Sequence, residues 1–119
     1  VVETSGHYAT HGCYAMDELM DISKPPTAVF GHNDSLAWGA LRWCHKHSRR
    51  VLQDVAIMGY DNIEYAEFAE PPLSTMNYAV EVVSRMAVDR IMRLIAAGDQ
   101  LPEPRVTLID PELVVRGST

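Results

Sequence analysis

Two short polar segments of the sequence could bind a small molecule, because each follows an apolar run that is typical of a buried strand. His32, Asn33 and Asp34 follow the first run, and Asp61 follows the second. Amide and carboxylate groups donate and accept the hydrogen bonds that hydroxyl-rich or heterocyclic molecules require. Asx turns and helix caps are the alternative role for such residues. Two such segments in one chain favour a binding site.

Catalysis and metal binding have less support. Asp34 and Asp61 could form an acid and base pair, but the sequence contains no nucleophile elbow, HExxH segment or phosphate-cradling glycine loop. Cys44, His45 and His47 lie close together in the sequence, yet on a helix they point in different directions and cannot easily enclose one ion. We therefore expect no catalytic residue, no metal and no cofactor.

Trp38 and Arg42 lie one helical turn apart and have two possible roles. They could stack as a surface pair, or they could anchor a subunit interface, where both residue types are enriched. The segment 42–50 is the only basic cluster in a chain with 10 lysines and arginines, 16 aspartates and glutamates, and a formal net charge of -6. This charge disfavours binding of the chain itself to nucleic acid or to anionic membranes.

The apolar pattern predicts the elements that position these side chains. Strands and helices alternate along the sequence, which predicts an α/β fold with a parallel sheet flanked by helices. The expected strands are residues 27–30, 54–58, 73–76, 106–109 and 113–115; the expected helices begin near residues 8, 35 and 80, with an irregular turn at 63–69. Open sheets of this kind bind ligands at the carboxyl ends of their strands. We expect Asn33 and Asp61 to face one shared hollow there.

The composition is that of an ordinary globular domain. The 119 residues are 47% hydrophobic and 22% charged, which is enough for one domain. Two cysteines without CxxC spacing favour a reducing compartment, and no apolar run is long enough for a membrane span. We expect a cytoplasmic protein without membrane contact. Because the chain begins with valine, we also expect it to be the later part of a longer protein.

Seven short segments, in a fixed order along nearly the whole chain, form one specific combination. They are residues 26–30, 33–34, 36–37, 39–41, 54–62, 72–75 and 111–119. This combination resembles the effector-binding core of lactose-repressor-type (LacI/GalR) transcription regulators. The resemblance implies a periplasmic-binding-protein-like fold of two lobes, with a sugar or related metabolite bound between them. A periplasmic sugar-binding protein of a transport system is the alternative, and an export signal upstream would distinguish it.

The resemblance also implies roles for particular residues. In the matching motifs, Asn33 and Asp61 occupy positions that hydrogen-bond the effector, and Tyr78 can line the cleft. Asp34 is expected to cap the following helix through its backbone amides. His32 is an unusual neighbour for the Asn33 and Asp34 pair, which leaves room for an atypical effector.

The resemblance implies two macromolecular partners. One is a second copy of the chain, because Trp38, Arg42, Tyr65 and Phe68 match the dimerisation surface. The other is operator DNA, held by an N-terminal helix-turn-helix domain that this chain lacks, with the effector changing the geometry of the dimer.

The resemblance finally divides the chain into three parts. Residues 1–78 would form the C-terminal lobe, residues 79–105 a crossover helix and linker that normally belong to the other lobe, and residues 106–119 the return strands. The helix from Val80 carries an apolar stripe that would lack its native sheet. Burying such a stripe is worth several kcal/mol at about 25 cal/mol per Å², so we expect it to pack against another chain or to rearrange.

Overall fold

A computed structural model describes residues 1–98 and 103–119 and confirms the predicted α/β fold. In chain order the elements are α1 (Ala9–Met20), β1 (Ala28–Phe30), α2 (Asp34–Lys46), β2 (Ala56–Tyr60), the 3-10 turn η1 (Glu64–Ala66), β3 (Ser74–Asn77), α3 (Val80–Ala97) and β4 (Glu112–Val114). Part of the predicted linker, residues 99–102, lies outside the described residues. The strand predicted at 106–109 does not form, since these residues pair with no strand of the described chain.

The four strands form one sheet in the order β1-β2-β3-β4. The first three strands run parallel, and β4 runs antiparallel to β3. Helix α1 packs on α2, and α2 packs on β2. The core fills the space between these helices and the sheet, and its most buried members are Met16, Cys44, Val55, Ile57 and Leu73.

Hydrogen bonds join the C-terminal segment to β2, to β3 and to the chain between these two strands. The Ser118 hydroxyl donates to the Ile57 carbonyl at 2.6 Å and accepts from the Ser74 amide at 2.8 Å. The Arg116 guanidinium donates to the Leu73 carbonyl at 2.8 Å and to Asn62 Oδ1 at 2.9 Å. The chain end thereby fixes both β3 and the segment that follows β2.

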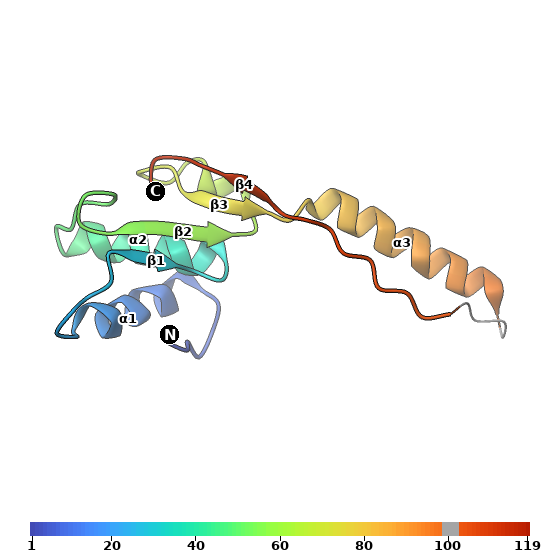
Figure 1. The fold of residues 1–119 in the computed structure, drawn as a ribbon, viewed down its shortest axis with the longest axis horizontal. Helices are drawn as coiled ribbons and strands as arrows, with labels where there is room; N and C mark the ends of the chain where they lie inside the picture. The colour runs from blue at the N-terminus through green and yellow to red at the C-terminus, as the bar shows by residue number, and fades with distance from the viewer. Residues whose placement is uncertain (99–102) are drawn as a thin grey trace.

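Helix α3 and the returning segment 103–111 form an arm that projects from the sheet (Figure 1). None of the residues of α3 is buried. The arm gives the chain a radius of gyration of 18.3 Å, where a compact chain of this length has about 14 Å. The apolar stripe expected on α3 is uncovered within this chain. The packing of this stripe against another chain stays a prediction. Across residues 1–98 and 103–119, no helix combines the length and apolar character that a membrane crossing requires.

Candidate functional site

The carboxyl ends of the parallel strands bring the two predicted segments to one edge of the sheet. Phe30 of β1 is the register partner of Met58 of β2. Asn33 follows β1 and Asp61 follows β2, each three residues along the chain from its member of this pair. Both residues therefore follow the carboxyl ends of neighbouring parallel strands. The arrowheads of β2 and β3 point toward α3, so this edge is also the one from which the arm projects (Figure 1).

Asn33 is held in one orientation by both ends of its amide. Its Oδ1 accepts from the Leu36 amide at 2.8 Å, which makes Asn33 the N-cap of α2. Its Nδ2 donates to the His7 carbonyl at 3.3 Å. A side-chain amide has two N–H groups and two acceptor lone pairs, so one donor and one acceptor site remain for a ligand.

The prediction that Asp34 caps α2 is wrong, because Asn33 takes that position and Asp34 serves another purpose. Asp34 is only 1% exposed. Its Oδ1 accepts from the Thr75 hydroxyl at 2.6 Å and its Oδ2 from the Ile63 amide at 2.9 Å. Asp34 thus joins the start of α2 to β3 and to the segment after β2. A buried carboxylate with these partners cannot reach an effector or act with Asp61 as an acid and base pair.

Asp61 presents an uncommitted carboxylate at the end of β2. Its backbone amide donates to the Met76 carbonyl at 2.9 Å, and its φ of 115° lies in the left-handed region. The carboxylate takes part in no hydrogen bond within the described part of the chain. Partial burial and the neighbouring charge of Asp34 raise its pKa, and the nearby His32 lowers it. A hydrogen bond donated by a ligand hydroxyl would therefore stabilise this carboxylate.

Tyr78 lies two residues beyond Met76, the register partner of Tyr60. The rings of Tyr60 and Tyr78 stack with centroids 5.9 Å apart and planes 9° apart. The pair supplies a partly exposed aromatic surface with two hydroxyl groups at the same sheet edge. Sequence reasoning singled out Tyr78 but missed the stacking partner Tyr60, although Tyr60 lies within a motif it had quoted.

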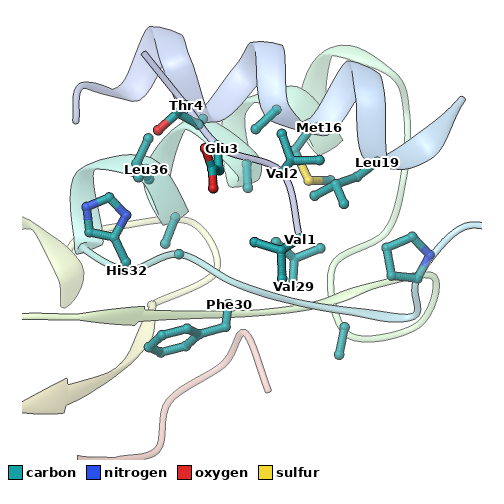
Figure 2. Close-up of a pocket in the computed structure, with 17 residues that line it drawn as sticks. Val1, Val2, Glu3, Thr4, Met16, Leu19, Val29, Phe30, His32 and Leu36 are labelled. Atoms are coloured by element: carbon teal, nitrogen blue, oxygen red, sulfur yellow. The ribbon is translucent and has the colours of Figure 1, made fainter. Parts of the chain in front are cut away.

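A cavity of about 770 Å³ lies beside β1, between residues 1–4, α1 and α2. Figure 2 shows mostly apolar side chains around it, with Glu3, Thr4 and His32 toward the end opposite Leu19. Neither Asn33 nor Asp61 lines this cavity. It is therefore not the shared hollow expected for these two residues, which stand at an open edge in this lobe.

The predicted interface residues lie on α2 and around η1. The rings of Trp38 and Tyr65 stack with centroids 6.2 Å apart and planes 1° apart. Trp38, Tyr65 and Phe68 are all strongly exposed, and Arg42 is exposed one turn along α2. The stacked pair therefore joins α2 to η1, whereas the sequence had suggested a Trp38 and Arg42 pair.

The residues weighed as metal ligands do not form a site. Cys44 is buried, whereas His45 and His47 are exposed. His47 Nδ1 lies 2.9 Å from the Trp43 carbonyl, and its ring stacks on Trp43. No group of three or more His, Cys, Asp or Glu side chains in residues 1–98 and 103–119 is arranged to hold a metal ion.

Comparison with known proteins gives a consistent result. Residues 2–119 match a family described as periplasmic binding protein-like domain. Over 112 residues, 91% of this chain, the sequence is 38% identical to the HTH-type transcriptional repressor CytR of Escherichia coli strain K12, and the match covers 31% of that protein. The chain thus spans about a third of the length of the curated relatives it matches.

Solved structures agree with this result. A regulator assigned to the LacI family from Sanguibacter keddieii superposes with a TM-score of 0.93 at 35% identity, over 99% of this chain and 43% of that one. The transcriptional regulator CelR, solved as a cellobiose complex, superposes with a TM-score of 0.77 at 35% identity, over 94% of this chain and 34% of that one.

Proposed function

The chain belongs to the family of periplasmic-binding-protein-like domains, in the form found in LacI-type transcriptional regulators, and from this premise we propose that it senses a small-molecule effector for such a regulator. The effector is a sugar or a related polar metabolite. Its binding changes the affinity of the whole protein for operator DNA. The relatives named above are one transcriptional repressor and two transcriptional regulators rather than enzymes, and the chain acts by binding alone.

One observation carries this proposal: Asn33 and Asp61 follow the carboxyl ends of neighbouring parallel strands and have unused hydrogen-bonding capacity. The donor and acceptor left on the Asn33 amide suit one hydroxyl group, and the Asp61 carboxylate can accept from two more. The Tyr60 and Tyr78 stack adds an aromatic surface that suits the apolar face of a sugar ring or a heterocycle. The cellobiose bound to CelR is a ligand of this chemical class.

The arm completes the effector cleft with the other lobe. In this proposal residues 1–78 form the C-terminal lobe, residues 79–105 cross to the other lobe, and residues 106–119 return. Val80, Val83 and Ile91 are exposed apolar residues of α3 on one face of the helix, and they pack on the sheet of that lobe. The arm leaves the sheet edge that carries Asn33 and Asp61, so a lobe seated on it closes over both residues.

The protein acts as a homodimer. Trp38, Tyr65 and Phe68 expose a large aromatic area on α2 and beside η1, with Arg42 close by in the sequence of α2. Aromatic residues and arginine are enriched at the centres of protein interfaces. Operator DNA is held by a helix-turn-helix domain outside this chain, because the net charge of -6 gives the chain itself little attraction for phosphates.

A thermal-shift screen of the intact protein tests the effector site. Cellobiose, other sugars, sugar acids and nucleobases are added over a concentration series, since a ligand at about 100 times its Kd adds about 2.7 kcal/mol of stability. Asp61→Asn and Asn33→Ser should abolish the ligand-induced rise in Tm. Serine can replace the N-cap acceptor that asparagine provides, so the second variant keeps α2 capped.

The matched control is Asp89→Asn, an exposed carboxylate on α3, which should keep the full rise. Each variant is compared with its own ligand-free Tm. Wild-type shifts in both site variants would refute the assignment of Asn33 and Asp61.

A further inference from the structure

Two histidines from separate segments meet at the candidate effector site. His7 precedes α1 and His32 lies between β1 and α2, and their ring nitrogens His7 Nδ1 and His32 Nε2 are 3.1 Å apart. The rings meet edge to face, with centroids 5.2 Å apart and planes 88° apart. Both residues are exposed. Nothing in the sequence motifs marked His7 as part of the site.

His7 also contacts Asn33, one of the two candidate effector-binding residues. Its carbonyl accepts the Asn33 Nδ2 hydrogen bond at 3.3 Å, so one residue contacts both His32 and Asn33. The other hydrogen bond of this segment, from the Thr4 hydroxyl to the Gly6 carbonyl, is local. The ring contact and the start of α1, where the Tyr8 carbonyl accepts from the His11 and Gly12 amides, together keep the His7 carbonyl in place beside Asn33.

We propose that the His7 and His32 pair positions the Asn33 amide for the effector and releases it when both imidazoles are protonated. A hydrogen bond between two imidazole nitrogens needs one N–H donor and one unprotonated acceptor. Two imidazolium rings have donors only and repel each other. The pair then separates, the His7 carbonyl leaves Asn33 Nδ2, and the amide is free to turn away from its binding orientation.

Titratable groups from three other parts of the chain lie near the pair. Glu3 lines the same cavity as His32 (Figure 2), and Asp61 lies close enough to interact electrostatically with His32. From α1, the His11 ring lies against Gly6, so it is the titratable group of that helix nearest to the segment. Imidazole is the side chain that ordinarily changes charge between pH 5 and 8, so a test of the release spans this range.

The positioning role rests on the proposed effector function, but its structural half is tested without any effector. In the 15N-labelled protein with EDTA present, the side-chain amide resonance of Asn33 is followed by NMR from pH 8 to pH 5. We expect it to move with the imidazole resonances of His7 and His32. In His7→Phe, which keeps a ring but has no ring nitrogen, the Asn33 resonance should stay still over the same range.

His32→Phe is the second variant and should give the same loss of pH response, while His45→Gln, an exposed histidine on α2, should leave the response intact. A wild-type Asn33 resonance that does not move with pH would overturn the proposal. So would one that moves equally in wild type and His7→Phe.

The functional half is tested with cellobiose as the probe. If cellobiose binds, its Kd should rise at least tenfold from pH 8 to pH 5.5 in wild type and less than twofold in His7→Phe. A tenfold rise in both would overturn the positioning role. The effector assignment is tested separately, because wild-type thermal shifts in the Asn33 and Asp61 variants would refute it.

Discussion

The buried carboxylate of Asp34 accepts a 2.6 Å hydrogen bond from the hydroxyl of Thr75. This bond reaches from the start of α2 to β3, past the intervening strand β2. The second bond of the carboxylate, from the Ile63 amide, fixes the chain just after Asp61 and Asn62. Asp34 therefore holds both polar segments of the candidate site without itself facing the effector.

Replacing Asp34 should destabilise the fold. Asp34→Ala leaves the Thr75 hydroxyl and the Ile63 amide without their partner, and hydrogen bonds to charged groups contribute about 1.5–3 kcal/mol each. We expect a loss of about 3 kcal/mol and a drop in Tm of roughly 10 °C, measured by circular dichroism. Thr75→Ser keeps the hydroxyl and should cost far less than Thr75→Val. A drop of less than 2 °C in Asp34→Ala would contradict this role.

Gly59 should tolerate no larger side chain while Asp34 is present. A Cβ at position 59 would overlap Asp34 Oδ1, so Gly59→Ala must displace the carboxylate from Thr75 or shift β2. Overpacking of this kind costs about 1–3 kcal/mol. In a double-mutant cycle, Gly59→Ala should cost clearly less in the Asp34→Ala background than in wild type. Equal costs in the two backgrounds would show that the two positions do not interact.

Asp61 should lower the stability of the ligand-free protein while it contributes to effector binding. Its raised pKa means that the folded state holds the proton more tightly than the unfolded state does. Stability therefore falls as pH rises from the ordinary aspartate pKa to the raised folded value, and the penalty persists at neutral pH. We expect Asp61→Asn to raise the ligand-free Tm at pH 7, an advantage that shrinks toward pH 3, and to weaken effector binding. A lower Tm for Asp61→Asn at pH 7 would contradict this account.

The local pattern of the sequence was sufficient to predict β1, β2 and β3, because each is a short run of strand-forming residues bounded by turn residues. It placed Asn33 and Asp61 at one sheet edge for the same reason. It assigned the cap of α2 to Asp34, whereas Asn33 takes that position. That choice depends on Thr75, 41 positions away from Asp34 in sequence, and no local pattern reports such a contact. The expectation that the first strand is buried was wrong, because Ala28 and Phe30 of β1 are exposed.

Long-range pairing also explains the other differences. Residues 106–109 have the apolar pattern of a strand, yet a strand needs a neighbour, and of the described residues after α3 only 112–114 pair with β3. The role of His7 depends on a contact with His32, 25 positions away. A glycine, histidine and tyrosine run before a helix carries no signal for such a contact.

Cys44 should be unreactive in the folded protein. Its side chain is fully buried, and burial raises the pKa of the thiol from 9.0 to about 11, with Asp54 adding to this effect and Arg49 opposing it. A thiol reagent at pH 8 should therefore modify Cys13 well before Cys44, and Cys44 only on unfolding. The same shift predicts that stability declines as pH rises from about 9 to about 11. Mass spectrometry of the labelled peptides measures both rates, and equal rates would refute the burial of Cys44.

The stacked Trp38 and Tyr65 rings should lie at the centre of the dimer interface. Trp38 is 48% exposed, Tyr65 62% and Phe68 74%, so all three could be covered by a second copy. Aromatic residues at interface centres contribute about 2 kcal/mol or more, which corresponds to roughly a thirtyfold rise in the dimer Kd. Trp38→Ser and Phe68→Ser should each shift the intact protein toward monomer in sedimentation velocity at micromolar concentration. Tyr14→Ser, which removes an aromatic ring that is 68% exposed on α1, should leave the dimer unchanged. If Tyr14→Ser dissociates the protein and Trp38→Ser does not, the dimer forms through α1 and the interface assigned to α2 and η1 is wrong.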